Sequence, residues 1–202
     1  MKLKDLFEIR VPSLGYASNH EVVKNYSGGN LDLSYKGLYS LDGCPEHVTG
    51  HFKCAYATLP TLKGGPQTVD GDYICYNNNL MTLDGAASHV GGSFICHGNP
   101  IKTLEGIPKF IGGDFSCQDS RLVSLEGIHE QLSQIGGSFD VRGNHIRSHV
   151  LGLTLIKGLV EISTDKKELN RILNRHLGKG RAGMLMAQEE LIEAGLEEFA
   201  QL

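Results

Sequence analysis

Cysteine is the residue type whose spacing in this chain first suggests chemistry. There are five cysteines, and the last four follow one another at intervals of 21 residues: Cys44, Cys54, Cys75, Cys96 and Cys117. A catalytic thiolate needs an exposed, electropositive site, and a zinc site needs closely paired ligands, so this even interval favours neither. An odd number of cysteines also argues against a disulfide framework. We therefore expect the four regularly spaced cysteines to be buried structural residues and Cys44 to be a small core filler.

Histidine is the second residue type that could support chemistry. His145 and His149 are four residues apart, but they follow a predicted strand, so we expect a surface pair rather than a metal site. The segment Gly178-Lys179-Gly180-Arg181 lacks the strand and the glycine frame of a phosphate-binding loop, and no nucleophile elbow or carboxylate pair is evident. The sequence thus predicts no catalytic residue, no metal site and no cofactor, and we expect a protein that is not an enzyme.

The elements that position these residues are internal repeats of 21 residues. The unit reads L-x-x-L-x-G-x-P-x-x-V-x-G-x-F-x-C-x-x-N, and the last unit, from Leu122 to Ile146, has three extra residues between Gly127 and Gly137. Leucines at fixed offsets with this period are typical of a leucine-rich solenoid. The repeats hold the leucine columns Leu38, Leu59, Leu80, Ile101, Leu122 and Leu41, Leu62, Leu83, Leu104, Leu125.

Each repeat contains one predicted strand with an inward face. In G-x-F-x-C the aromatic residue and the cysteine are two positions apart, so both point to the same side of a strand. Stacking such strands makes each column a ladder in the core. We expect the glycine pairs to form corners, and L-x-G-x-P to form a turn on the opposite side, where His47 and His89 would lie. Asn78, Asn99 and Asn144 are expected to bond the backbone of neighbouring coils.

The repeats resemble a known group of proteins. The strings SLDGCPEHVTGHFKC, TLDGAASHVGGSFIC and TLEGIPKFIGGDFSC resemble the S-L-E-G-x-P-x-x-V-G-G-x-F-x-C theme of leucine-rich-repeat-like proteins of tailed, T4-like bacteriophages. The resemblance covers residues 29–146, departs from the theme at Ala87 and His129, and extends to the C-terminal string QEELIEAGLEEFAQL. It implies a solenoid fold and a phage origin, with the host cytoplasm as the location.

The ends of the chain are predicted to differ from the repeats, because the terminal coils of a solenoid must be covered. We expect an N-terminal cap over residues 1–28, repeats over residues 29–146 and a C-terminal helical cap over residues 147–202. A capping box of Asp165 and Glu168 predicts a helix that ends at Leu177. Its apolar stripe is Leu169, Ile172, Leu173 and His176. A second helix from about Ala182 is predicted to carry Leu185, Ile192, Leu196 and Phe199 on one side.

The fold class predicted is therefore an α+β solenoid: a short, leucine-rich-repeat-like β-solenoid closed by a helical hairpin. Charge is divided between the two helices. Residues 163–181 hold six basic and two acidic side chains, net +4, whereas residues 182–202 hold five glutamates and no base, net −5. We expect complementary solvated faces, with a partner or nucleic-acid contact on the basic helix as the weaker alternative.

Composition excludes several classes of protein. The chain has 202 residues and a net charge of −4, which argues against a broad phosphate-binding face. No apolar run is long enough to span a membrane, and the N-terminus lacks the apolar core of a signal peptide. We expect a soluble, cytoplasmic protein without nucleic-acid or membrane partners.

The outward positions of the strands supply the candidate site. Ile74 and Ile95 occupy the same position in adjacent repeats, with Tyr76 and His97 beside them. An apolar and aromatic cluster with a polar rim is typical of a protein interface. The polar rim is expected to consist of His51, Lys53, Asp72, Ser93, Asp114 and Ser116. Cover by the C-terminal hairpin, or no role at all, are the alternatives.

These observations predict a non-enzymatic protein-binding module. With the phage resemblance, they favour a protein that binds a host protein, such as a defence protein, and inhibits or redirects it. The alternative is a structural or assembly protein that self-associates through the solenoid ends or the C-terminal helices, and the oligomeric state is open. The sequence does not identify the partner, because a repeat scaffold accommodates many surfaces.

Overall fold

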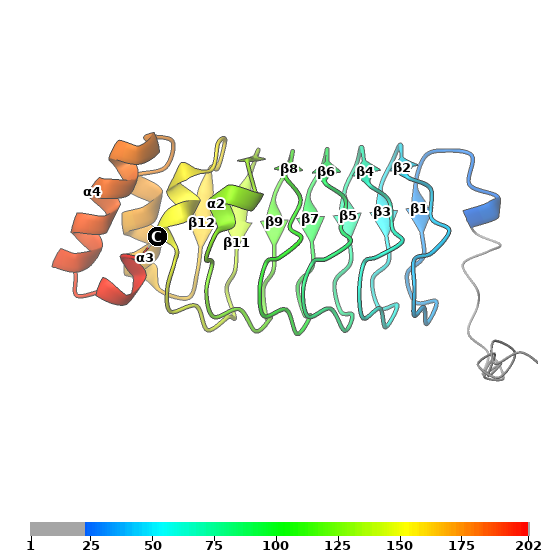
Figure 1. Ribbon diagram of the computed structural model, residues 1–202, viewed down its shortest axis with the longest axis horizontal. Helices are drawn as coiled ribbons and strands as arrows, with labels where there is room; N and C mark the ends of the chain where they lie inside the picture. Colours follow the sequence, from blue (N-terminus) through cyan, green and yellow to red (C-terminus); the bar gives the residue numbers. More distant parts are fainter. Residues whose placement is uncertain (1–22, 202) are drawn as a thin grey trace, which may run out of the picture.

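The computed structural model describes residues 23–201 and shows an elongated parallel β-solenoid with helices at its C-terminal end (Figure 1). One side is a seven-stranded parallel sheet in the order β1-β3-β5-β7-β9-β11-β12. Its strands are β1 (Leu31–Asp32), β3 (Phe52–Lys53), β5 (Tyr73–Ile74), β7 (Phe94–Ile95), β9 (Phe115–Ser116), β11 (Ser138–Asp140) and β12 (Glu161–Ser163). The predicted solenoid is therefore confirmed, while most of the proposed N-terminal cap, residues 1–22, lies outside the described residues.

A second sheet, which the repeat pattern does not predict, forms another side of each coil. It pairs five short parallel strands in the order β10-β8-β6-β4-β2. They are β2 (His47–Val48), β4 (Thr68–Val69), β6 (His89–Val90), β8 (Phe110–Ile111) and β10 (Gln134–Ile135). The expectation that His47 and His89 lie on a turn is wrong: both are outward residues of this sheet, and their apolar neighbours Val48 and Val90 are fully buried.

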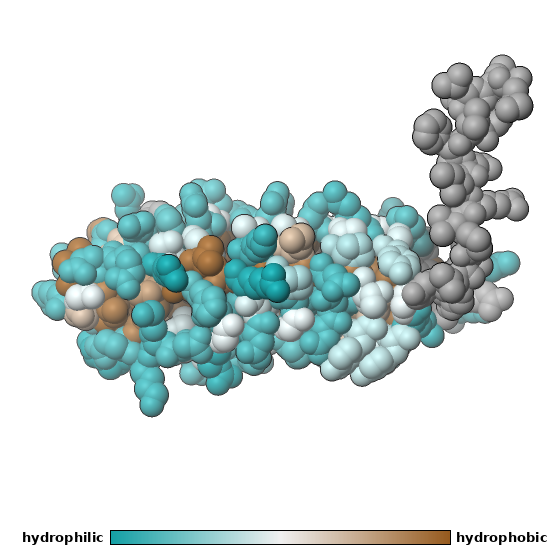
Figure 2. All heavy atoms as spheres, turned by 90° about the horizontal axis from the view of Figure 1, so that it is seen from below, coloured by the Kyte–Doolittle hydropathy of each residue, from teal (hydrophilic) through white to brown (hydrophobic). Residues whose placement is uncertain are grey.

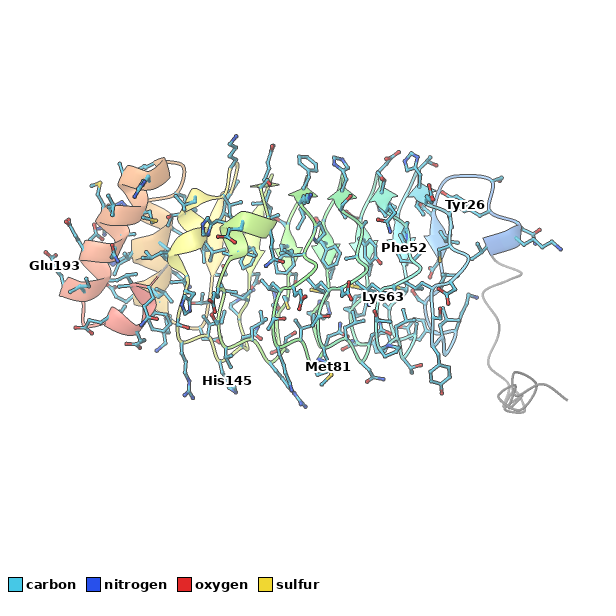
Figure 3. The ribbon with its side chains drawn as sticks, in the orientation of Figure 1. Tyr26, Phe52, Lys63, Met81, His145 and Glu193 are labelled. Carbon is cyan, nitrogen blue, oxygen red and sulfur yellow. The ribbon has the colours of Figure 1, made fainter. Side chains whose placement is uncertain are left out.

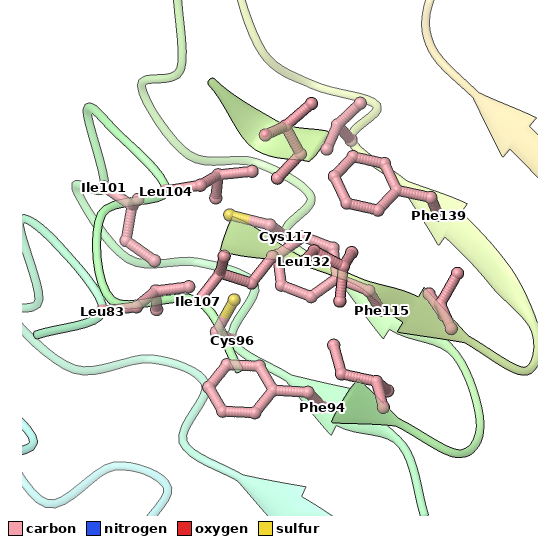
Figure 4. Close-up of a cluster of buried hydrophobic side chains, with 14 of the residues drawn as sticks. Leu83, Phe94, Cys96, Ile101, Leu104, Ile107, Phe115, Cys117, Leu132 and Phe139 are labelled. Carbon is pink, nitrogen blue, oxygen red and sulfur yellow. The ribbon is translucent and has the colours of Figure 1, made fainter. Parts of the chain in front are cut away.

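The core between the two sheets consists of the predicted ladders. Aromatic side chains stack from coil to coil, with ring centroids 5.0 Å apart for Tyr73 and Phe94. The cysteines lie beside them, and in Figure 4 the sulfur atoms of Cys96 and Cys117 point in among the leucine and isoleucine side chains. Figure 3 shows the same division further along the molecule, with Phe52 inside the coil and the exposed Met81 and His145 directed outward from the loops.

The core thiols are shielded from solvent. Cys54, Cys75, Cys96 and Cys117 are completely buried and free of disulfides. Burial raises the pKa of Cys54, Cys75 and Cys96 well above the ordinary value for a thiol. Cys44 is only half-buried, and burial, followed by the charge of Asp42, raises its pKa to about 11. The raised pKa values keep the thiols of Cys44, Cys54, Cys75 and Cys96 protonated near neutral pH, which fits the predicted structural role.

Glycine recurs at two positions of the repeat for different physical reasons. Gly43 and its equivalents adopt positive φ, 89° at Gly43, where each L-x-G turn reverses the chain. The other column allows neighbouring coils to approach closely: a Cβ atom on Gly112 would lie 2.0 Å from the carbonyl oxygen of Gly91. A side chain at Gly112 would therefore separate its coil from the preceding coil.

The asparagine ladder bonds the coils together inside the core. The side-chain oxygen of Asn99 accepts hydrogen bonds from the backbone N–H groups of Asn78 and Leu80, at 3.0 and 3.2 Å. Its side-chain nitrogen donates to the carbonyl oxygens of Cys75 and Cys96, at 3.1 and 2.8 Å. Asn99 is almost fully buried, so it satisfies groups that would otherwise be costly to bury.

The end of the repeats differs from a regular coil. The three extra residues of the last unit are accommodated by the short helix α2 (Ile128–Gln131). The coil then continues through the 3-10 helix η2 (Leu151–Leu155) to β12, which pairs with β11. Two packed helices follow, α3 (Lys167–Arg175) and α4 (Gly180–Glu193), and then the 3-10 helix η3 (Glu197–Phe199).

Two details of the predicted hairpin are wrong. No side chain caps α3: the carboxylate of Asp165 instead accepts the N–H of Gly143, and Glu168 pairs with Arg171. In α4 the buried residues are Gly183, Met184, Ala187 and Leu191, while Leu185 and Ile192 are exposed. The second helix ends at Glu193, so Leu196 and Phe199 do not extend its face. The apolar stripe predicted for α3 is buried as expected.

Candidate functional site

The outward face of the seven-stranded sheet carries the predicted cluster. Lys53, Ile74 and Ile95 are paired in register on β3, β5 and β7. Ile74 and Ile95 are half-buried, so their side chains form adjoining apolar surface on the outside of the coil. Two residues further along the chain, at the next outward position, Tyr76 stacks against His97, with ring centroids 4.6 Å apart and planes 12° apart.

This aromatic contact is part of a longer row of rings that the repeat pattern did not predict. The ring of Tyr56 meets Tyr76 edge-on at 5.4 Å and stacks on Tyr35 at 4.8 Å. Tyr35 and Tyr56 are exposed, so the row of Tyr35, Tyr56, Tyr76 and His97, here called the aromatic row, follows the solenoid axis on the outside. The 21-residue interval between Tyr35 and Tyr56 was the available signal.

Tyr35 and Tyr56 have an unusual backbone conformation. Their φ angles are 59° and 52°, in the left-handed region. The same turn position in later coils has residues that tolerate this conformation: Asn77, Gly98, Asp119 and Gly143. Bulky residues held there cost on the order of 1–2 kcal/mol each, and such strain is concentrated at functional sites.

A groove of about 570 Å³ lies between the aromatic row and the first strands. Its lining combines tyrosines and Ile74 with charged groups: Asp32, Ser34, Tyr35, Lys36, Lys53, Ala55, Ile74 and Tyr76. The pKa of Tyr35 is raised, first by desolvation and then by the neighbouring phenols of Tyr76 and Tyr56. The Tyr35 phenol therefore remains a hydrogen-bond donor at neutral pH. We call this space the tyrosine groove.

The predicted polar rim is occupied by bonds within the protein. The N–H of Asp72 donates to Nδ1 of His51 at 2.9 Å, and the N–H of Ser93 donates to Asp72 at 2.7 Å. In the next coils the N–H of Asp114 donates to the hydroxyl oxygen of Ser93 at 3.1 Å, and the N–H of Ser138 donates to the carboxylate of Asp114 at 2.7 Å. Four of the six rim residues therefore stabilise successive coils, and Lys53 and Ser116 lie in the column beside them.

The C-terminal half of the face is polar and internally bonded. The side chain of Gln118 donates to Asp140, and Arg142 forms an ion pair with the same carboxylate at 2.6 Å. Partial burial alone would raise the pKa of Asp140, but the bonds and charge of Arg142, with the bond from Gln118, hold that pKa below its ordinary value. This half has little unsatisfied surface to offer a partner.

The C-terminal helices do not cover Ile74 and Ile95. Helix α3 packs on β12 and η2, α4 packs on η2 and α3, and both lie beyond the last strand, at the opposite end from β1 (Figure 1). Asn174 of α3 both accepts the N–H of Ile162 and donates to its carbonyl oxygen, at 2.7 and 3.0 Å. Asn170 does the same for Thr164, so α3 replaces the next coil.

The hydropathy of the surface changes along the solenoid axis. Seen from below the view of Figure 1, the surface is mostly hydrophilic, with the strongly hydrophobic residues gathered mainly toward the helical end (Figure 2). None of the helices in residues 23–201 is long and apolar enough to cross a membrane. Within the same residues, no three His, Cys, Asp or Glu side chains are arranged to hold a metal ion.

Comparisons with models of protein families, with curated proteins and with solved structures found no match to this chain.

Proposed function

We propose that this protein is a non-enzymatic binding module that holds a partner protein on the N-terminal half of its sheet face. The observation that supports the proposal best is the adjoining pair Ile74 and Ile95, flanked by the Tyr76–His97 stack. Half-buried aliphatic residues beside stacked aromatic rings provide apolar contact area at small entropic cost, as interface cores do.

The proposal includes an origin and a role for the interaction. The support for an origin is the resemblance of the repeat to those of T4-like phage proteins. We propose a host protein as the partner, in the host cytoplasm, with inhibition or redirection of that partner as the outcome. The solenoid supplies a rigid surface, since each coil is bonded to the next by the asparagine and rim ladders.

The direct test is capture of a partner from lysates of candidate bacterial hosts, followed by mass spectrometry. The double variant Ile74→Asp/Ile95→Asp should lose the captured protein, because two carboxylates would be desolvated in the interface. A matched control is Gln67→Asp/Ser88→Asp, which adds the same charge at exposed positions of the same two coils. This control should retain capture.

Two results would contradict the proposal. Equal capture by the wild type and by the Ile74→Asp/Ile95→Asp variant would place the interface elsewhere. Loss of capture by both double variants would indicate an effect of net charge rather than of this face. Circular dichroism and the melting temperature show whether each variant remains folded.

A further inference from the structure

We infer that the tyrosine groove receives an acidic polypeptide segment of the partner. This inference rests on the proposed function, because it assigns the chemistry of the partner at one end of the same face. The groove adjoins Ile74, so a partner that covers the isoleucine pair would reach it directly.

The first argument is charge. Lys36 and Lys53 line the groove, and within residues 23–201 neither has an ion-pair partner. Asp32 also lines the groove and lies opposite Lys53 on the neighbouring strand, but it forms no ion pair with Lys53 and accepts the N–H of Ser34 at 2.9 Å. With Asp32 counted, the groove still carries one net positive charge. The chain as a whole has a net charge of −4, so a groove with a net positive charge is a local exception. Carboxylates of a partner would complement them.

The second argument is the conformation of Tyr35 and Tyr56. Asparagine, aspartate or glycine satisfies the same backbone position in four later coils, so folding does not require tyrosine there. Tyrosine adds exposed ring surface and a phenol hydroxyl at a cost in backbone strain. Phenol hydroxyls donate hydrogen bonds to carboxylates, and the rings provide apolar contact beside them.

The third argument separates a polypeptide from a single-stranded nucleic acid. Nucleic-acid platforms present open aromatic faces on which bases stack. Here Tyr35 covers Tyr56 at 4.8 Å and Tyr76 covers His97 at 4.6 Å, so a base cannot enter between the rings of either pair. Two lysines would also neutralise too few phosphates for strong binding. Ring edges, hydroxyls and ammonium groups suit an acidic peptide better.

The test selects ligands from a displayed library of random peptides of about a dozen residues, using the full chain as bait. We expect the enriched peptides to carry two or more carboxylates. A selected peptide should bind Lys36→Glu/Lys53→Glu about tenfold or more weakly by fluorescence anisotropy, since two ion pairs become repulsive. The same peptide with lysine in place of its acidic residues should regain affinity for that variant.

The tyrosines are tested with Tyr35→Asn/Tyr56→Asn, which places a residue that tolerates positive φ at both positions. We expect this variant to be as stable as the wild type or more so, yet to bind the peptide several-fold more weakly. Enrichment of neutral or basic peptides, binding unaffected by the lysine reversal, or equal binding of an oligo-dT strand would overturn the inference. If Ile74→Asp/Ile95→Asp still loses the captured partner in that case, the proposed function stands and only the groove assignment fails.

Discussion

The two halves of the sheet face have the same backbone and different side-chain chemistry. On β3, β5 and β7 the outward positions hold Lys53, Ile74 and Ile95, beside the aromatic row. On β9 and β11 they hold Ser116 and Asp140, and Asp140 is bonded to Gln118 and Arg142. The polar half completes its own bonds, whereas the apolar half leaves contact surface and two lysines without carboxylate partners within the described residues.

This difference shows that the repeated backbone of the coil does not determine which side chains occupy its outward positions. Inward positions are constrained by packing in every repeat, because each inward side chain must fill the space between the side chains of the coils on either side of it. Outward positions are free of that requirement. The apolar and unpaired groups on one half of the face are therefore not explained by the packing of the coils.

The largest expected effect breaks the feature that both halves share, the close stacking of the coils. Gly112→Ala should lower the free energy of unfolding by about 3 kcal/mol or more, because the added methyl group would collide with the carbonyl oxygen of Gly91. Gly43→Ala is the control: nothing lies within 4 Å of its Cβ position, so only positive φ is penalised, at about 1 kcal/mol. Urea denaturation measures both, and equal losses would contradict the close-approach explanation.

The second prediction concerns the asparagine ladder, which is interrupted where the two halves meet. Asn99→Ala should cost about 3 kcal/mol, because it leaves buried backbone groups on two coils without partners. Ser120→Asn should instead gain about 1 kcal/mol by offering its side-chain oxygen to the N–H groups of Asn99 and Ile101. If thermal melts show a loss for Ser120→Asn, the ladder does not extend across the boundary.

The third prediction concerns the hydrogen bonds by which α3 covers the edge of β12, the last strand of the polar half. Asn170→Ala/Asn174→Ala removes the side chains that bond the last strand, and we expect a loss of about 2 kcal/mol. The backbone groups at the edge of β12 would then lack partners and should pair with another copy of the protein. Light scattering should therefore show a mass that rises with protein concentration. A wild type that already associates in this way would favour the assembly alternative over the binding module.

The smallest expected effect is a pH dependence confined to the polar half. The pKa of Asp140 is lowered in the folded protein, so its contribution to stability is present above the ordinary carboxyl pKa and is lost as the pH falls through the folded pKa. Between about pH 5 and 3 the melting temperature of Asp140→Asn should therefore fall less steeply than that of the wild type. Parallel slopes would show that Arg142 and Gln118 do not stabilise the charged form.

Much of the fold could be predicted from particular columns. The spacing of Phe94 and Cys96 indicated one inward strand face, and the interval of 21 indicated the coil. The second sheet was missed because two-residue strands such as His89–Val90 have no alternating pattern long enough to detect. The buried face of α4 was wrongly assigned because alanine and glycine, Ala187 and Gly183, carry the packing while larger residues face outward.

The candidate site was predicted in part. Ile74, Ile95, Tyr76 and His97 were identified from alternation along the strands, and the structure brings them together on one face. His51, Asp72, Ser93 and Asp114 were expected at a polar rim, but whether their oxygen and nitrogen atoms face solvent or the next coil depends on the distance between coils. Tyr35 and Tyr56 were missed because their position follows the strand, where the chain turns with positive φ.

The amino-acid sequence was sufficient to predict the 21-residue period and the inward residues. These follow from local rules, since side-chain direction alternates along a strand and repeats add in register. The tertiary structure was needed to show which outward groups are bonded within the protein, which rings stack and where a groove remains. Those properties depend on contacts between residues about 21 positions apart, whose geometry is set by the stacking of whole coils.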